Sequence, residues 1–329
     1  MPSISRLFYV AMKTGNFFSD GEGLRSTFTC LLVVGSFGSC FELAELHAAA
    51  GNPPIFSSPV GLTTVRYFPD RNTYLYVSDS VQNAIYAINL NLDLSTYALD
   101  LTSNTVTLIS GTPGTAGSTT RSSPEGVRYN QPCGLAFGQD TRVGSAVSVR
   151  DPGHTYVADS GNGLIRGAGG DVIAGSASQR GNQDGSGTVA TFSTPSYLIS
   201  NEYGTTLFVT DSGNHSVRKI VIAYNFGLQH PVTDPTPDIT TVSTILGTAG
   251  IAGSADGVGT AAQFNHPTGI AACSDGFYIA DTGNETIRRY NTNTNSVSTV
   301  AGWPSSTNLR SGILACHVQA GSCCWCRTL

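Results

Sequence analysis

Charged residues are scarce in this sequence, and the scarcity narrows the range of partners. Asp, Glu, Lys and Arg make up 12% of the 329 residues, and the formal net charge is −5. Lysine occurs only as Lys13 and Lys219. A chain of this charge has no general electrostatic attraction to phosphate backbones, so the composition disfavours nucleic acid as a partner.

Long hydrophobic runs are also absent. The most apolar stretch, residues 29–41, is shorter than the roughly 20 residues that a membrane-spanning helix needs. It lies far from Met1 and follows Asp20 and Glu22, which is unlike a cleaved signal peptide. We expect a buried strand or short helix there and no membrane span. The compartment, secreted or cytoplasmic, stays open.

Motifs of cofactor and metal sites are missing as well. The sequence has no nucleotide-binding loop, no nucleophile elbow, and no His-x-x-x-His or Glu-x-x-His pair among its six histidines. The cysteines near the C-terminus do not form the two Cys-x-x-Cys pairs of a structural zinc site. We interpret them as disulfide-bonded or as part of a tail without a role. We predict no catalytic residue, no cofactor and no metal site.

What the sequence does contain is a repeated pattern of short apolar runs. In the clearest copy, from Gly253 to Gly302, three runs follow Pro267 and a fourth ends at Val300, with Gly, Asn and Asp between them. This pattern is typical of strands joined by tight turns and predicts a four-stranded antiparallel sheet. One such sheet cannot bury both faces alone, whereas copies arranged around an axis cover one another.

Three further copies have the same internal order. Each has an aromatic residue three positions before a proline: Phe56 and Pro59, Tyr129 and Pro132, Phe192 and Pro195, Phe264 and Pro267. Each second strand ends in an aspartate: Asp79, Asp159, Asp211 and Asp281. In three copies a turn with an asparagine follows, namely Asn162, Asn214 or Asn284, whereas the first copy reads Ser80-Val81-Gln82-Asn83. An Asp-Gly-x-Gly loop begins at Asp184 and at Asp256 and is missing from the second copy.

These motifs resemble the NHL repeat, which is a blade of a β-propeller. The resemblance rests on Asp-Gly-x-Gly-Thr-x-Ala-x-Phe-x-x-Pro, Tyr-Ile-Ala-Asp-Thr-Gly-Asn and Val-Ser-Thr-Val-Ala-Gly in the fourth copy, and more loosely it extends back to Phe56. It implies an all-β propeller whose loops bind partners, and it implies no reaction. Four whole copies lie at the low end of the ~4–8 blades of propellers, so we expect either an incomplete ring or a ring that closes with a distorted blade from residues 29–55.

The copies divide the chain into four regions. Residues 1–28 resemble the last strand and Asp-Gly-x-Gly loop of a blade, 29–55 form an irregular insert, 56–302 hold the propeller modules, and 303–329 form an irregular tail. Within the insert, Phe41 to Ala50 has helical spacing and composition, and Gly51-Asn52-Pro53 ends it. We therefore expect a short helix there.

The recurring polar residues are interpreted as structural. Aspartates that end a strand cap the backbone N–H groups of the turn, and the asparagines belong to the same turns. This interpretation covers Asp79, Asp159, Asp211, Asp281, Asn162, Asn214 and Asn284. Basic residues also recur after the turns, and we interpret them as solvated positions. They are Arg166, Arg218, Lys219, Arg288 and Arg289.

Two other site patterns have simpler explanations. Asp184 and Asp256 supply too few oxygens for calcium, which needs about six or more, so their loops are interpreted as turns. Asn214 and Asn284 also match the glycosylation sequon, but both coincide with the turn of the repeat and are weak evidence for secretion.

Two hypotheses about function follow. The first is a non-catalytic scaffold that binds a protein or glycan partner through long loops of one face, residues 139–152 and 226–238. The candidate binding residues in these loops are Phe226, His230, Asp234, Arg142 and Arg150. The alternative is a propeller enzyme, a metal-dependent lactonase or lyase acting at the central channel. Zinc there would need histidines from different blades, and His154, His215 and His266 are the candidates. The lack of a catalytic signature favours the scaffold.

Overall fold

The computed structural model of the chain describes residues 8–14, 28–34, 44–46, 56–66, 73–89, 92–93, 98–99, 106–120, 126–138, 155–201, 204–223, 239–302, 315–317 and 325–327. The chain divides into two compact units, Met1–Phe56 and Ser57–Leu329. The regular elements of the described residues are strands and short 3-10 turns. No helix among them is long and apolar enough to cross a membrane.

The first unit contains a three-stranded antiparallel sheet in the order β1-β2-β3. Its strands are β1 (Phe8–Thr14), β2 (Phe28–Val34) and β3 (Ala44–Leu46). The helix expected between Phe41 and Ala50 is therefore wrong at β3, where Leu46 pairs with Phe28. Helix propensity is a weak preference, and pairing with a neighbouring strand overrides it.

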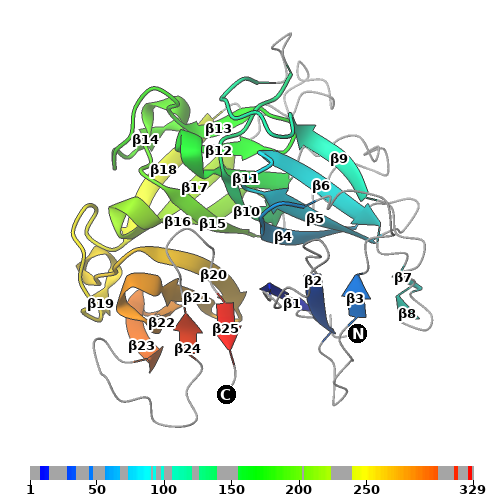
Figure 1. Cartoon of the computed structure of the whole chain (residues 1–329). Coiled ribbons are helices and arrows are strands. Elements are labelled where there is room, and N and C mark those ends of the chain that lie inside the picture. The colour runs from blue at the N-terminus through cyan, green and yellow to red at the C-terminus, as the bar shows by residue number, and fades with distance from the viewer. Residues whose placement is uncertain are drawn as a thin grey trace, which may run out of the picture. The chain divides into compact units, whose positions relative to one another are not determined.

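The second unit contains four antiparallel sheets, which we call blades 1 to 4 (Figure 1). Blade 1 comprises β4 (Pro59–Arg66), β5 (Thr73–Asp79), β6 (Ala84–Asn89) and β9 (Val106–Gly111). Blade 2 comprises β10 (Pro132–Phe137), β11 (Thr155–Asp159), β12 (Leu164–Gly167) and β13 (Val172–Gly175). Blade 3 comprises β15 (Pro195–Ser200), β16 (Thr206–Asp211), β17 (Ser216–Ala223), β18 (Ile239–Leu246) and the short β14 (Gly185–Ser186). Blade 4 comprises β20 (Pro267–Cys273), β21 (Gly276–Asp281), β22 (Thr286–Asn291), β23 (Ser296–Gly302) and the short β19 (Gly257–Val258).

Two small strand pairs lie outside the blades. They are β7 (Leu92–Asp93) with β8 (Ala98–Leu99), and β24 (Ala315–His317) with β25 (Trp325–Arg327). The expected four-stranded modules are thus confirmed, and each of the four begins at the proline that follows its aromatic residue.

The first strands of consecutive blades lie side by side and run in the same direction. β4 contacts β10, β10 contacts β15, and β15 contacts β20. Near the starts of β10 and β15, a Cβ added to Gly134 would lie 2.6 Å from Cα of Tyr197. Beyond their ends, one added to Gly138 would lie 2.1 Å from Cα of Gly204. Sheets joined along their first strands form a β-propeller, so the expected fold class is confirmed.

The hydrophobic cores lie between the blades. Three clusters of buried residues each join one blade to the next, and each contains the aromatic residue of the repeat motif. Tyr129, Phe192 and Phe264 are all fully buried. Burying a large apolar side chain stabilises the fold by about 1.5–3 kcal/mol. Because this burial requires two blades, the blades stabilise one another.

One position in the first strand differs among the blades. Two residues after the proline, blades 1, 2 and 4 have Gly61, Gly134 and Gly269, whereas blade 3 has Tyr197. The hydroxyl of Tyr197 donates a hydrogen bond to the backbone carbonyl of Val60 in β4. Blade 3 is therefore linked to blade 1 as well as to its sequence neighbours.

Candidate functional site

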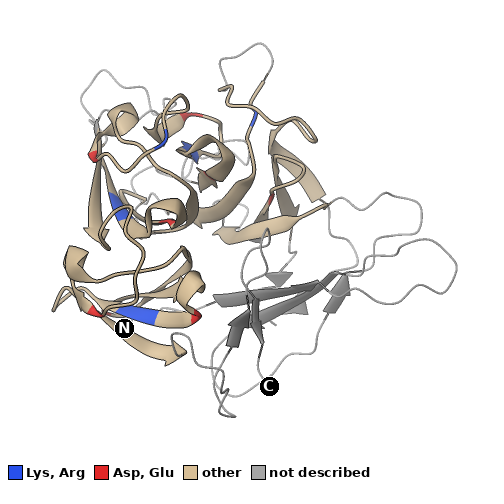
Figure 2. Cartoon of the chain, turned by 60° about the vertical axis from the view of Figure 1, so that its left-hand side comes forward, with Lys and Arg blue, Asp and Glu red and all other residues tan. Residues whose placement is uncertain are grey.

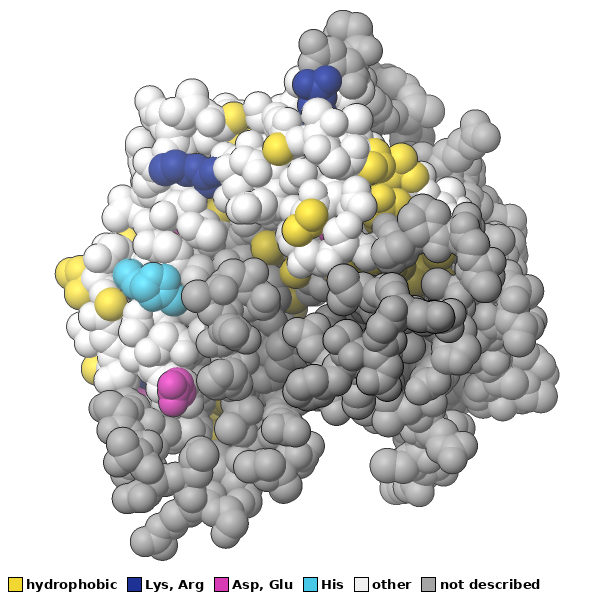
Figure 3. Space-filling model, in the orientation of Figure 1, with side chains coloured by type: hydrophobic (Ala, Val, Ile, Leu, Met, Phe, Trp, Pro, Cys, Tyr) yellow, Lys and Arg dark blue, Asp and Glu magenta, His cyan; other side chains and the backbone are white. Residues whose placement is uncertain are grey.

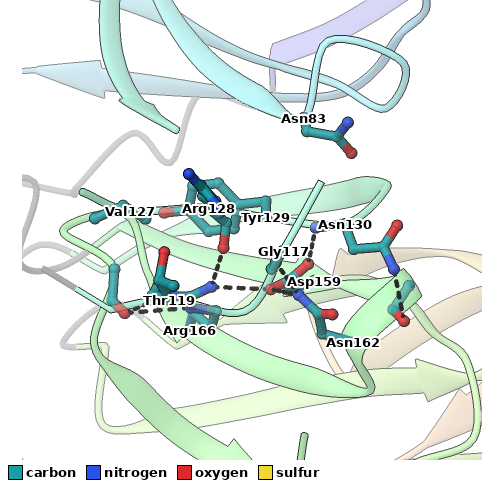
Figure 4. A network of polar contacts seen from close by, with 12 residues as sticks. Asn83, Gly117, Thr119, Val127, Arg128, Tyr129, Asn130, Asp159, Asn162 and Arg166 are labelled. Carbon is teal, nitrogen blue, oxygen red and sulfur yellow. Dashed lines mark hydrogen bonds and ion pairs between the residues drawn. The ribbon is translucent and has the colours of Figure 1, made fainter. Parts of the chain in front are cut away.

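Blade 2 contains a buried polar network that joins several parts of the repeat motif (Figure 4). The Nη1 atom of Arg166 donates to Oδ2 of Asp159 at 3.1 Å and to the carbonyl of Arg128 at 2.7 Å. Its Nη2 atom donates to the carbonyl of Thr119 at 2.6 Å. The guanidinium carbon lies 4.8 Å from the centre of the Tyr129 ring, within the range of a cation–π contact. The side chains of Arg166 and Asp159 have no exposed surface.

Blades 3 and 4 repeat this network at the same positions. The buried ion pairs are Arg218 with Asp211 at 3.3 Å and Arg288 with Asp281 at 2.7 Å. In these blades the guanidinium carbon lies 5.0 and 5.1 Å from the centre of the motif phenylalanine ring. In three blades the buried arginine therefore contacts the same kinds of group: a carboxylate, backbone carbonyls and the face of an aromatic ring.

The recurring basic residues thus fall into two groups. The interpretation as solvated positions is wrong for Arg166, Arg218 and Arg288, because each is fully buried beside an aspartate. Lys219 and Arg289 are partly exposed, as that interpretation expects. Figure 2 shows how few charged residues the described strands carry, so the three buried pairs use a large share of them. The sequence signal was the constant spacing of seven residues from each aspartate to its arginine.

The motif aspartates connect the second strand to the segment that follows the aromatic residue. Oδ1 of Asp159 accepts the backbone N–H of Asn130 at 2.8 Å, and Oδ1 of Asp281 accepts that of Asn265 at 2.7 Å. Asp211 bonds its blade in the same way. In blades 2, 3 and 4 the aspartate caps none of the backbone N–H groups of its own turn, so the cap expected there is wrong.

The turn asparagines complete the network. The amide of Asn162 donates to Asp159 at 2.8 Å and to the carbonyl of Gly117 at 2.6 Å. Asn214 and Asn284 make the equivalent pairs of bonds in blades 3 and 4. These amides are engaged in the fold, and a glycan on Asn214 or Asn284 would disrupt their bonds. The structure therefore gives both sequons a structural explanation.

Blade 1 has no arginine at the equivalent site. Tyr86 occupies the arginine position, and burial raises its pKa, with a smaller contribution from the charge of Asp79. Asp79 instead accepts four backbone N–H groups, two before β4 and two in its own turn. They belong to Ser57, Ser58, Val81 and Gln82. The turn without the Gly-Asn sequence is thus held by the aspartate itself.

The Asp-Gly-x-Gly loops supply a second carboxylate to the arginines. Asp184 pairs with Arg218 at 2.7 Å and Asp256 pairs with Arg288 at 2.8 Å, while the two carboxylate side chains stay 47% and 51% exposed. In blade 2, which lacks the loop, Nη2 of Arg166 donates to the carbonyl of Gly170 at 2.6 Å where the other two blades have this carboxylate. Within the described ranges, no group of three or more His, Cys, Asp or Glu side chains could hold a metal ion.

The protonation of the buried aspartates follows from their surroundings. Burial raises the pKa of Asp159, Asp211 and Asp281, and their N–H donors and paired arginines oppose that shift. A general acid or base must come within hydrogen-bonding distance of a substrate. These three carboxylates have no surface through which a substrate could reach them, so the network supports the blades.

Two histidines form a surface junction between blades 3 and 4 (Figure 3). The backbone N–H of His266 donates to Nδ1 of His215 at 3.0 Å, and the two rings pack edge to face with centroids 4.4 Å apart. Asn83 makes the equivalent bond between blades 1 and 2, its Oδ1 accepting the N–H of Gln131 at 2.8 Å. His154, the third proposed zinc ligand, lies outside the described residues.

Acid should weaken this junction. Burial, and then the charge of His266, lower the pKa of His215, while Asp281 opposes the shift. The folded state therefore binds this proton less readily than the unfolded state, whose histidines titrate at about pH 6.5. Stability is complete above that pH and falls below it. Between about pH 7.5 and 5.5 we expect urea unfolding to show a loss of about 0.5–1 kcal/mol, the net contribution of one hydrogen bond.

His215→Asn is the matched control for this pH effect, because Asn83 fills the same position between blades 1 and 2. Asparagine accepts the bond without titrating, so the variant should lose this part of the pH dependence. An H215N protein with the same pH dependence as the wild type would rule out the junction as its origin.

The two long loops leave the same end of neighbouring blades. Residues 139–152 belong to the connection from β10 to β11, and residues 226–238 to the connection from β17 to β18. Strand direction alternates within an antiparallel sheet, so first-to-second and third-to-fourth connections share an end. Gly138 and Gly204 bring blades 2 and 3 together at this end. The candidate residues Phe226, His230, Asp234, Arg142 and Arg150 lie outside the described residues.

Sequence comparison supports the repeat assignment. No protein-family model matches the chain. NHL repeat-containing protein 2 of Homo sapiens is 31% identical over 96 residues, covering 29% of this chain and 11% of that protein. The Bos taurus protein of the same name is 29% identical over 108 residues, covering 33% of this chain and 12% of that protein. The repeats of this chain are NHL-type blades.

This chain spans only a small fraction of the length of these two relatives. Protein SUPPRESSOR OF QUENCHING 1, chloroplastic, of Arabidopsis thaliana is 29% identical over 180 residues, 51% of this chain and 14% of that protein. Among solved structures, an auxiliary nutrient binding protein from Bacteroides ovatus has a TM-score of 0.46 at 11% identity, covering 85% of this chain and 53% of that one. Such partial overlap supports no transfer of function.

Proposed function

We propose that the chain is a non-catalytic scaffold that binds a protein or glycan partner at the loop-bearing end of blades 2 and 3. The observation that supports this proposal is the shared end from which residues 139–152 and 226–238 leave. Long loops held on a rigid scaffold are frequent recognition elements. The buried charged residues of the NHL-type blades are enclosed in the fold and are not exposed to a partner.

The composition of the two loops suits binding. Phe226 and His230 offer ring surfaces, and Asp234, Arg142 and Arg150 offer charges for orientation. Pro231, Pro235 and Pro237 restrict the second loop, which lowers the entropy lost when a partner binds. Aromatic and charged side chains are residue types that can bind both a polar protein surface and a sugar.

A loop exchange tests this proposal with turns that the chain already contains. Residues 139–152 are replaced by the Ser274-Asp275 turn of blade 4, and residues 224–238 by its Thr292–Asn295 turn. Binding is measured against a glycan array and by quantitative affinity capture of identified proteins. We expect the double exchange to abolish binding while the melting temperature stays near that of the wild type.

Point variants separate recognition from folding in that experiment. Phe226→Ala and Arg142→Ala keep both loops and should each weaken binding by about tenfold, the range of a contact residue. Full binding by the loop-exchanged protein would contradict the proposal. The alternative, a metal-dependent lactonase or lyase, predicts stoichiometric calcium or zinc in the purified protein, which elemental analysis measures.

A further inference from the structure

Blades 1 to 3 each have one face, which we call the forward face, that packs against the next blade. In blades 1 to 3 it carries an aromatic residue three positions before the motif aspartate, a branched residue six positions after it, and an isoleucine in the last strand. They are Tyr76, Ile85 and Ile109 in blade 1, Tyr156, Ile165 and Ile173 in blade 2, and Phe208, Val217 and Ile245 in blade 3. These residues pack into the clusters that enclose the motif aromatic residue of the following blade.

Hydrogen bonds reinforce each forward face. The hydroxyls of Ser78 and Thr210 donate to the backbone carbonyls of Cys133 and Thr268 in the following blade. The residue four positions after the aspartate forms a further junction. At this position the side chains of Asn83 and His215 each accept a backbone N–H of the following blade. Between blades 2 and 3 that position is Gly163, and Arg180 donates to the carbonyls of Ser160 and Ser193 at 3.0 and 2.9 Å. A forward face thus contacts apolar side chains and backbone groups of the following blade. Between blades 2 and 3 it also contacts the side chain of Arg180.

Blade 4 carries the same forward face, but its residues are exposed. Tyr278 and Val300, the equivalents of Tyr156 and Ile173, are 40% and 48% exposed. Ile287 is only partly buried, whereas its three equivalents are fully buried. Glu285 stands at the junction position, exposed and in the left-handed conformation with φ 57° that Asn83 and His215 also adopt.

The backbone of blade 4 also has room for a neighbour. A Cβ added to Gly61 or Gly134 would lie 2.0 or 2.6 Å from the backbone of the next blade. At Gly269 the nearest atom would be Cβ of Ala280, at 3.5 Å and within the same blade. Blade 4 therefore has the glycine that permits a close approach, but within the described residues no backbone of another blade approaches it.

We propose that the forward face of blade 4 is a docking surface for an NHL-type blade of a second protein. The partner blade presents an aromatic-x-x-Pro segment to Tyr278, Ile287 and Val300. It presents a basic residue to Glu285, at the position that Arg180 occupies in blade 3. The three equivalent faces, those of blades 1 to 3, are each covered by such a blade. The negative charge of Glu285 favours partner blades that have a basic residue at the facing position.

A second copy of this chain does not fit the surface as well. The face of blade 1 that would meet it is already covered, since Leu75, Val77 and Ile88 are at most 4% exposed. Blade 1 also has Tyr86 in place of the motif arginine. The docking surface is separate from the loop-bearing end, so this proposal and the proposed scaffold function can fail independently.

Photocrosslinking of the full chain tests the proposal. Benzoylphenylalanine replaces Tyr278, the protein is irradiated in an extract of its own cells, and the crosslinked peptide is sequenced. We expect a peptide of another protein that contains aromatic-x-x-Pro within an NHL-type repeat. A peptide from a second copy, a peptide without that motif, or no crosslink would overturn the proposal.

Two controls keep the experiment specific. The same photoreactive group at Val81, which is 61% exposed in the turn of blade 1, should not yield this peptide. With the probe moved to Val300, Glu285→Lys should reduce the yield by about tenfold or more, because it reverses the selecting charge. Glu285 is exposed, so the melting temperature should not change. Equal yields with and without E285K would overturn the assigned charge preference.

Discussion

Replacing Arg218 by methionine should lower the free energy of unfolding by about 3–5 kcal/mol, the usual effect of removing one partner of a buried ion pair. Asp211 would remain fully buried without its counter-charge, and the carbonyls of Thr191 and Gln183 would lose their donor. Methionine keeps most of the side-chain volume, so the change reports mainly on charge. Urea denaturation at neutral pH measures it.

The loss in R218M should depend on pH in a defined direction. Burial already raises the pKa of Asp211, and removing the arginine raises it further. A carboxyl whose folded pKa exceeds its unfolded value of about 3.9 destabilises the fold only above that pH. The difference between wild type and R218M should therefore be smallest near about pH 4, where the loss of the carbonyl hydrogen bonds remains, and should grow as the pH rises.

Two companion variants make this result interpretable. Arg289→Met removes a partly exposed ion pair with Asp275 and should change stability by at most about 1 kcal/mol. Adding Asp211→Asn to R218M removes the unpaired charge and should recover part of the loss. An R218M protein within about 1 kcal/mol of the wild type would show that the buried pair contributes no more than a surface pair.

Gly134→Ala should cost about 1–3 kcal/mol, the effect of overpacking a tight contact. The new Cβ would lie 2.6 Å from Cα of Tyr197 and 2.8 Å from the carbonyl oxygen of Ser196, and neither atom can rotate away. Blades 2 and 3 would have to separate along their first strands. Thermal and urea unfolding of the single variant measure the loss.

Gly269→Ala is the matched control, because Gly269 has the same position in blade 4. Its Cβ would meet Ala280 at an ordinary contact distance of 3.5 Å. Removing the backbone freedom of a glycine from the unfolded chain can stabilise a protein by about 0.4–1 kcal/mol. We expect G269A to be unchanged or slightly more stable. Equal losses in the two variants would show that the effect comes from the strand and not from the contact between blades.

The fold was largely predictable because its signals are local. Turn residues and aromatic-x-x-Pro segments mark the ends of short strands in each copy, and four copies of one pattern leave little choice of architecture. The error at β3 has the opposite origin. A helical composition between Phe41 and Ala50 is a weak local signal, and pairing of Leu46 with Phe28 decides the structure there.

The seven-residue spacing of aspartate and arginine is visible in the sequence, but the other partners of the buried arginines were not predictable from local sequence. Arg166 is held by the carbonyl of Thr119, which lies 47 positions earlier in the chain. His215 and His266 are 51 positions apart and still form one junction. Such partners become neighbours only after the blades assemble. The partner-binding assignments, including Phe226 and Arg142, stay predictions that the loop exchange tests.

Tyr197 has a consequence for how the molecule opens. Its hydroxyl bonds blade 3 to blade 1, so local unfolding of blade 2 alone would leave blades 1 and 3 joined by this hydrogen bond. The described contacts of the fourth sheet run to the third. Native-state hydrogen exchange should therefore show the final sheet fraying first, and the preceding three losing their protection together as one cooperative body.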